Sequence, residues 1–432
     1  MRQSTALLIA AALFTGCDRD KDASTDDTDN TDSAHHTDGT TEAGPTWYQD
    51  VRPVVFDACA SCHNGEGIGP GDFQTYAGAF EGRDLISAYL AGGLMPLPSA
   101  DPECRPYKGH ERMRLSDEDR AMLIDWASGD ALEGDAETAT EAEIFSGVLA
   151  DADVIMPMPF EHTITPDDDG GEYFCMTPEN PFDEPTYVTG FDVELGNQEV
   201  VHHMCLFVDF RGNAGESYGV DDTSEGFQCA DPIIEDDWLP LHCWTPGMEP
   251  VEFPEDMGLF VAPQYQLVLQ MHYFVEGDAP QTDLSTYKFR TQPSVSREVW
   301  MEIDGPEDFQ IPAGDSEHSD HAYWRNNDTD YEILGAFPHM HKLGSGYHSW
   351  IEAPDGTEDC LVQGEYDFDH QMTYMLEEPL DFPKGSKIGV ECTWDNSASN
   401  PDQPSDPPQD VTWGEGTTEE MCYLLYYLAE KE

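Results

Sequence analysis

The feature that most constrains the fold is a change in sequence texture near residue 145. Before it, residues 46–130 carry helical signals, of which the clearest is a capping-box-like start at 116–119 leading into a helix that contains Leu123 and Trp126. After it, short β-branched and aromatic runs alternate with turns rich in Gly, Pro, Asp and Asn. These runs lie at 199–210, 266–275, 297–303, 331–337, 387–394 and 422–428.

The two textures predict a multidomain chain, with a small all-α domain followed by two all-β sandwich domains. We place the helical domain at 46–130, an acidic linker at 131–147, and the two β domains at 148–290 and 291–432. No internal repeat at a fixed period is visible.

The N-terminus predicts export. Residues 1–17 contain Arg2, an apolar run from Ala6 to Phe14, and a Gly16-Cys17 pair that resembles a bacterial lipobox. The run is too short to span a bilayer, and residues 18–45 read as a disordered acidic tether. We therefore expect a periplasmic or cell-surface bacterial lipoprotein that touches the membrane only through a lipid on Cys17.

The charge balance limits the partners. The chain has 88 acidic and 19 basic residues, a formal net charge of −69. A field of that sign repels nucleic acid and anionic lipid, so we expect no nucleic-acid partner, and it favours cationic partners such as a basic redox protein. It says little about the reaction.

Eleven cysteines in an exported chain predict disulfides. Cys17 is assigned to lipid and two more to the motif described next, which leaves an even number whose pairing the sequence alone does not fix. These eight are Cys104, Cys175, Cys205, Cys229, Cys243, Cys360, Cys392 and Cys422.

Residues 59–63 form a CxxCH motif, the pattern of covalent c-type haem attachment. Cys59 and Cys62 would bond the two haem vinyl groups, and His63 would supply an axial imidazole. The alternatives are a disulfide loop or half of a zinc site, but no second CxxC or matched His pair lies nearby. For the opposite axial ligand, Met95 in a Gly/Pro loop is the best candidate and Met113 the alternative.

The segment from 47 to 129 also resembles a class I-like cytochrome c family. The resemblance rests on Tyr48 and Pro53 before the CxxCH motif, on Met95-Pro96 after it, and on a closing helix that ends near Trp126. It implies one covalently bound haem c.

Four clusters in the β region carry metal-ligand side chains: 201–204 (VHHM), 269–273 (LQMHY), 337–341 (FPHMH) and 420–422 (EMC). Because residues i and i+2 of a strand share a face, His339 and His341 can chelate one ion. Adjacent His202 and His203 would diverge on a regular strand, so both bind one metal only if the strand twists or bulges. His272 would complete a three-histidine site. A thioether beside two imidazoles suits copper.

All four clusters in this order resemble the copper type II, ascorbate-dependent monooxygenases, over roughly residues 170–430. The resemblance extends to an opening strand at 173–176 and to a strand that contains Cys243-Trp244. It implies two jelly-roll-like domains that each hold one copper across a cleft. It also implies a disulfide between Cys392 and Cys422.

Carried over by residue, the resemblance implies that His202, His203 and His272 hold an electron-storing copper. His339, His341 and Met421 would hold the copper that binds O₂, and Gln270 takes a position linked to substrate or water contacts. The implied reaction is R–H + O₂ + 2e⁻ + 2H⁺ → R–OH + H₂O.

The sequence departs from the peptide-amidating members of this family at the substrate site. Phe337 stands where those members have Arg, and the tyrosines after Met421-Cys422 are out of register. A C-terminal glycine peptide is therefore not the expected substrate, and an unidentified neutral or apolar small molecule fits better. A haem in the same chain would relay electrons from an external donor. The alternative is a non-catalytic copper-binding or electron-transfer lipoprotein.

Overall fold

The structure is a computed structural model, and it describes residues 44–431 apart from short gaps at 66–68, 146, 166–170, 230–237, 276–279, 369 and 415–417. The predicted export signal and nearly all of the predicted tether lie outside the described residues. The described residues belong to one compact unit, Gly44 to Glu432.

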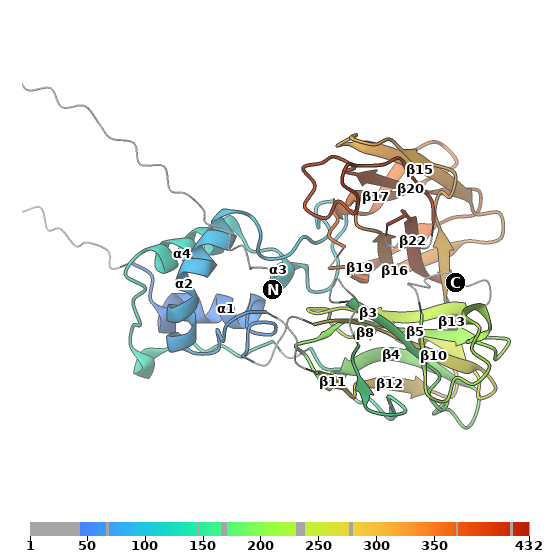
Figure 1. The fold of residues 1–432 in the computed structure, drawn as a ribbon, viewed down its shortest axis with the longest axis horizontal. Coiled ribbons are helices and arrows are strands. Elements are labelled where there is room, and N and C mark those ends of the chain that lie inside the picture. The colour runs from blue at the N-terminus through green and yellow to red at the C-terminus, as the bar shows by residue number, and fades with distance from the viewer. Residues whose placement is uncertain are drawn as a thin grey trace, which may run out of the picture. The chain divides into compact units, whose positions relative to one another are not determined.

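The first part of this unit is helical, as the sequence predicts (Figure 1). Its elements are η1 (Trp47–Val51), α1 (Arg52–Ala58), α2 (Tyr76–Ala91), α3 (His110–Met113), α4 (Asp117–Ser128) and η2 (Ala136–Thr138). The predicted cap of α4 is confirmed, because the Ser116 side chain accepts a hydrogen bond from the Asp119 N–H. Trp47, Leu123 and Trp126 are each about 1% exposed and form the centre of a small separate core.

The rest of the unit is built from strands, and all six predicted runs are among them. Before the midpoint of this region lie β1 (Val154–Pro157), β2 (His162–Thr163), β3 (Gly171–Met176), β4 (Thr186–Glu194), β5 (Val201–Asp209), β6 (Phe227–Gln228), β7 (Trp238–Trp244), β8 (Val251–Glu252), β9 (Met257–Val261), β10 (Gln266–Phe274), β11 (Thr282–Asp283) and β12 (Thr286–Gln292), with one helical turn, η3 (Glu216–Tyr218). After it lie β13 (Arg297–Asp304), β14 (Gln310–Ile311), β15 (His318–Arg325), β16 (Tyr331–Met340), β17 (Gly344–Glu352), β18 (Glu358–Glu365), β19 (Tyr374–Phe382), β20 (Lys387–Trp394), β21 (Val411–Thr412) and β22 (Cys422–Glu430).

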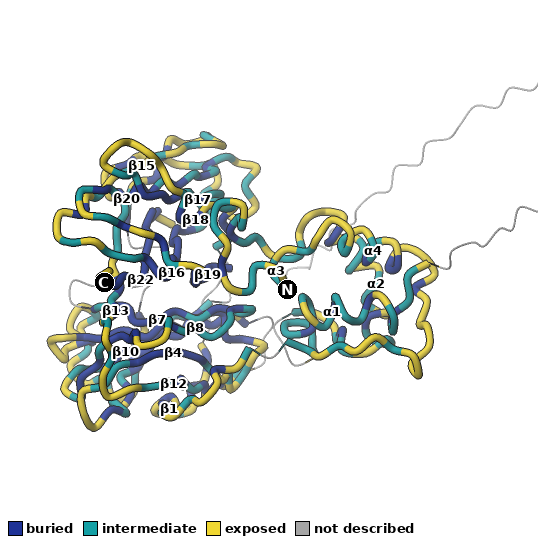
Figure 2. The backbone as a smooth tube through the Cα atoms, turned by 180° about the vertical axis from the view of Figure 1, so that it is seen from behind, coloured by how far each residue is buried: buried dark blue, intermediate teal, exposed yellow. Residues whose placement is uncertain are grey.

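The strands form sandwich-like layers around a common core. One sheet has the order β6-β3-β10-β5-β7, another the order β15-β20-β17-β18. The largest sheet runs β1-β12-β4-β9-β13-β22-β16-β19 and pairs β9 with β13 in parallel, so it joins both predicted β domains, which the sequence did not indicate. Its neighbouring strands β22 and β16 are buried along nearly their whole length (Figure 2).

The eight remaining cysteines pair as four disulfides: Cys104–Cys360, Cys175–Cys229, Cys205–Cys243 and Cys392–Cys422. The pair that the family resemblance implied is therefore confirmed. Four disulfides fit an exported protein. No helix among the described residues is both long and apolar enough to cross a membrane.

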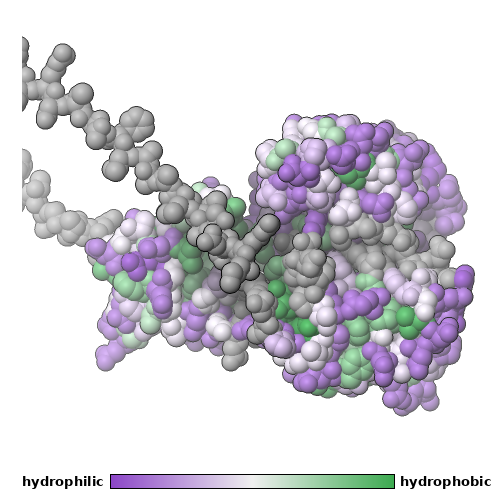
Figure 3. Space-filling view, in the orientation of Figure 1, coloured by the Kyte–Doolittle hydropathy of each residue, from purple (hydrophilic) through white to green (hydrophobic). Residues whose placement is uncertain are grey.

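A strap at residues 104–114, between α2 and α4, contacts both β regions. Its Cys104 is bonded to Cys360, Tyr107 forms a β-bridge with Leu376, and the Lys108 ammonium donates to the Glu252 carbonyl. The helical part is thus fixed by direct contacts as well as by the acidic linker. Polar side chains cover most of the described surface on the face drawn in Figure 3, as the excess of acidic residues requires.

Candidate metal centres

Three histidines converge between β5 and β10. The two strands pair with His203 opposite His272, and the register then shifts so that Tyr273 faces Val201. His202 is the extra residue of this β-bulge, which turns its ring to the same side as its neighbour's. The Nδ1 atoms of His202 and His203 are 3.4 Å apart, and the ring centroids of both lie 4.7 Å from that of His272. The β-bulge that His202 and His203 need in order to bind one metal is therefore present.

The environment favours the neutral, metal-binding form of two of these imidazoles, His203 and His272. Burial, followed by the charges of neighbouring histidines, holds the pKa values of His203 and His272 well below the usual range. Tyr173, opposite His272 on β3, stacks on its ring with centroids 3.9 Å apart. One candidate ligand atom from each of the three histidines lies within 4.8 Å of the others.

Gln270 lies two residues before His272 on β10 and is fully buried. Since residues i and i+2 share a face, its side chain lies on the same face of the sheet as the His272 ring. The structure thus brings Gln270 to the three-histidine cluster.

A second centre is formed where β16 ends. His339 and His341 share one face of the strand, and their ring centroids are 5.4 Å apart. In the antiparallel pair of β16 with β22, the last pair is Met340 with Cys422, and His341 and Met421 are the next residue on each chain. Met421 is 1% exposed. The register thus brings Met421 to the same end of the β16–β22 pair as His339 and His341, and the Cys392–Cys422 disulfide ties the start of β22 to β20.

Hydrogen bonds set the orientation of both rings at the second centre. His339 Nδ1 is 2.6 Å from Gln371 Oε1, and His341 Nδ1 is 3.1 Å from the Glu419 carbonyl oxygen. Both acceptors require the proton on Nδ1, which leaves the Nε2 lone pairs for a metal. The buried His339 Nε2 has no hydrogen-bond partner among the described residues. Burial lowers the pKa of His339 to about 3, so its ring is neutral.

A buried carboxyl group organises the loop around Met421. Glu420 is fully buried and accepts hydrogen bonds from the backbone N–H groups of His341 (3.0 Å) and Leu343 (2.6 Å) and from Trp394 Nε1 (3.0 Å). Glu420 thereby connects the segment that carries His341 and the indole of Trp394 to the residue that precedes Met421. Glu420 belongs to the fourth ligand cluster of the sequence, but its residue type alone predicts no such anchoring role.

The CxxCH residues line an apolar cleft in the helical part. Cys59 and His63 border a cavity of about 270 Å³ whose other walls include Leu90, Leu123 and Met95. The two cysteines are not joined in a disulfide, and burial raises the pKa of Cys59 to about 12. The His63 Nδ1–H donates to the Pro70 carbonyl at 2.8 Å, which leaves Nε2 for an axial metal ligand.

The structure distinguishes the two candidate axial methionines. Met95 borders the cleft with His63 and packs against the core of the helical part. Met113 packs against the β core instead, and its Cε lies 3.7 Å from the position that a Cβ on Gly247 would occupy. This arrangement favours Met95.

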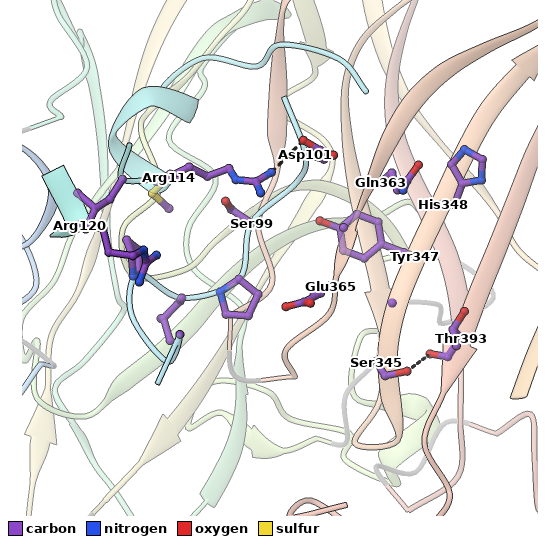
Figure 4. A pocket seen from close by; sticks show the side chains of 18 of the residues that line it. Ser99, Asp101, Arg114, Arg120, Ser345, Tyr347, His348, Gln363, Glu365 and Thr393 are labelled. Carbon is purple, nitrogen blue, oxygen red and sulfur yellow. Dashed lines mark hydrogen bonds and ion pairs between the residues drawn. The ribbon is translucent and has the colours of Figure 1, made fainter. Parts of the chain in front are cut away.

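A further cavity among the described residues lies away from both centres. It has a volume of about 740 Å³ and is lined by polar groups, including Arg114, Arg120 and Glu365 (Figure 4). Arg114 is paired with Asp101 at 2.9 Å. None of the histidines or methionines assigned to metals lines this cavity, so we do not assign the chemistry to it.

Comparison with known proteins agrees with the geometry. Residues 301–432 match the family model of the copper type II ascorbate-dependent monooxygenase, C-terminal domain. Peptidylglycine alpha-amidating monooxygenases of Rattus norvegicus and Mus musculus are each 23% identical over 274 residues, which cover 60% of this chain. The matches support the copper monooxygenase family. They cover 25% of each relative, so the chain spans about a quarter of their length.

Among solved structures, the major capsid protein P2 of bacteriophage PM2 is 8% identical and covers 64% of this chain and 97% of its own. Its TM-score is 0.24, too low to bear on fold or function.

Proposed function

We propose that this protein is a copper-dependent monooxygenase that inserts one atom of O₂ into a C–H bond of a small neutral substrate. The observation that supports the proposal is the convergence of three buried imidazoles at the first centre and of two at the second, where Met421 would add a thioether. Nitrogen ligands hold both oxidation states of copper, and a thioether favours Cu(I). A donor set of this kind suits redox chemistry better than a structural ion.

Copper bound at these centres would supply electron storage at His202, His203 and His272, and O₂ activation at His339, His341 and Met421. The chain's own contribution is orientation. The bulge at His202 aims two adjacent rings at one point, while Gln371 fixes the tautomer of His339. Burial excludes bulk water from both centres.

The substrate side of the second centre is apolar. Phe337 shares the face of β16 with His339, is 4% exposed, and has its ring centroid 6.4 Å from that of His339. It offers no charge to a carboxylate, so a substrate with a neutral or apolar group at this position is favoured.

The CxxCH segment supports covalent haem c as the electron input. Cys59 and Cys62 would hold the porphyrin, with His63 and Met95 as axial ligands. In this proposal an external donor reduces the haem, which replaces ascorbate as the source of electrons for copper. A signal peptide and a lipid on Cys17 would place the protein outside the cytoplasm.

The test uses ¹⁸O₂ with the full chain matured with haem and copper, reduced chemically, against a panel of small apolar and neutral compounds. We expect one ¹⁸O atom in the hydroxylated product, and no product with His339→Ala. Copper binding without ¹⁸O incorporation into any compound of a broad panel would favour the non-catalytic copper protein instead.

A further inference from the structure

The cavity of about 740 Å³ that lies away from both centres has a regular floor. The floor is one face of the three adjacent strands β20, β17 and β18, whose register aligns six cavity-lining residues in two rows across the sheet. One row is Glu391, His348 and Gln363, and the other is Thr393, Gly346 and Glu365. Cross-strand partners share a face, as do residues i and i+2, so all of these side chains point to the same side of the sheet.

The polar side chains of this floor are not used to hold the fold. Among the residues that the structure describes, the side chains of Glu391, His348, Gln363, Thr393 and Glu365 form no hydrogen bond with one another or with other groups. Burial holds the pKa of His348 below its usual value, although the charge of Glu391 raises it, so the neutral ring offers one donor and one acceptor. The floor therefore presents uncommitted donors and acceptors at positions that strand pairing fixes.

The wall opposite the strands carries two arginines, Arg114 from the strap and Arg120 from α4 (Figure 4). Arg114 is paired with Asp101. Arg120 is half-buried, and its Nη1 donates to the carbonyls of Leu90 at 2.9 Å and Met95 at 3.0 Å. Because these bonds use one nitrogen of the guanidinium, Arg120 is a fixed group with further N–H donors beside the cavity.

Direct bonds join this wall to the floor. The Asp101 N–H donates to the Gln363 carbonyl at 2.7 Å, and Arg105 Nε donates to the Cys360 carbonyl at 2.8 Å. Cys104 is joined to the same Cys360 by a disulfide. The cavity is therefore a preformed site whose volume is within the range of about 300–1,000 Å³ that is usual for small-molecule sites.

The charges that line the cavity limit the ligands that it can take. Four acidic side chains stand against two basic ones, namely Asp101, Asp117, Glu365 and Glu391 against Arg114 and Arg120. An anion would meet an excess of negative charge, and an apolar molecule would leave the floor without hydrogen bonds. A neutral molecule with several hydroxyls avoids both costs, since each hydroxyl can donate to a carboxylate and accept from a guanidinium or an amide.

We propose that this cavity binds a neutral carbohydrate, such as a short oligosaccharide, across the face of β20, β17 and β18. The inference is independent of the proposed function, because none of the histidines assigned to copper lines the cavity. The protein would thus have a carbohydrate-binding site separate from its candidate metal centres.

Gly346, at the middle of the second row, gives a way to block the site. A Cβ added there would lie 3.5 Å from the Gly364 carbonyl oxygen and 3.8 Å from the Thr393 Cβ, which are ordinary contacts. Gly346→Leu is therefore expected to fold and to place its side chain over the floor. Arg120 is left unchanged, because its loss would also disturb the Met95 loop.

The experiment is isothermal titration of the full chain, matured with haem, with maltose, cellobiose, lactose, glucose and glucuronate. The chains compared are the parent, Gly346→Leu, Glu365→Ala and Glu358→Ala, each checked by thermal unfolding. Glu358 is the matched control, because it is an exposed glutamate of the same strand β18 and does not line the cavity.

We expect at least one neutral sugar to bind the parent and Glu358→Ala equally, and to bind Gly346→Leu and Glu365→Ala about tenfold more weakly. Glucuronate should bind more weakly than glucose. The inference is wrong if no sugar of the panel binds the parent, if glucuronate binds more tightly than glucose, or if a folded Gly346→Leu binds as the parent does. Should Gly346→Leu not fold, Glu365→Ala decides, because parental affinity in that variant refutes the site. The test for ¹⁸O in a hydroxylated product can fail without changing any of these results.

Discussion

Gln371 gives the sharpest test of how the second centre is organised. It is 5% exposed, its Oε1 accepts the His339 Nδ1–H at 2.6 Å, and its Nε2 donates to the Phe368 carbonyl at 2.9 Å. Replacing it by leucine keeps the approximate volume but removes the acceptor that fixes the His339 tautomer. The ring could then put its proton on Nε2, the nitrogen assigned to the metal.

The expected magnitude follows from this geometry. Loss of an outer-shell partner of a metal-binding histidine weakens metal affinity by about 10–100-fold, which is about 1.4–2.7 kcal/mol. In the copper-free protein, a buried donor left unsatisfied costs about 1–3 kcal/mol of folding free energy. Gln371→Leu should therefore lower both quantities, with the copper effect confined to one of two sites.

The assay is a copper titration of the copper-free chain with a competing chelator, alongside a thermal unfolding curve. Asn326→Leu is the matched control, because Asn326 is likewise a buried amide. Its Nδ2 donates to the carbonyls of Thr329 and Phe382. It should lower stability without changing copper affinity. Parental affinity at both sites in a folded Gln371→Leu protein would refute the role of this hydrogen bond.

Three further predictions concern the helical part, the pH dependence and the strap. Met95→Leu should remove the methionine-ligated haem spectrum, whereas Met113→Leu should leave it unchanged, as recorded by absorbance of the matured protein. Burial raises the pKa of Asp304 from 3.8 to about 6. The folded state thus binds this proton more tightly than the unfolded state, and stability should fall as the pH rises from about 4 to about 6. This fall should be smaller in Asp304→Asn, measured by denaturant unfolding across that range. Replacing the pair Cys104 and Cys360 by serine should reduce the free energy of unfolding by about 2–5 kcal/mol.

Each of these has a contradicting result. Loss of the native haem spectrum in Met113→Leu alone would reverse the axial assignment. Parallel pH profiles for the parent and Asp304→Asn would mean that Asp304 does not titrate in that window. Unchanged unfolding of the Cys104→Ser/Cys360→Ser double variant would show that the strap is held by its noncovalent contacts.

Much of the fold could be predicted because local patterns and tertiary structure agree. The Ser116 cap and the apolar period of α4 determine that helix, and six β-branched runs determine strands such as β16 and β22. The continuous sheet through β9 and β13 could not be predicted, since strand order depends on nonlocal pairing that periodicity does not encode.

The part of the candidate site that could be predicted is the part encoded by residue type and local spacing. The i, i+2 spacing of His339 and His341 indicates that both side chains lie on one face of a strand. The adjacent His202 and His203 can share a metal only at a bulge, and the structure contains that bulge. Gln371 was missed because a lone glutamine 30 residues from His341 carries no local pattern. Only the fold brings Gln371 to the side chain of the candidate metal ligand His339.

The most direct test of the central claim is the metal and haem content of the full chain after maturation with haem and copper, compared with His341→Ala. We expect two coppers and one haem per chain in the parent, and one copper and one haem in the variant. One haem without stoichiometric copper, or a variant that retains both coppers, would contradict it.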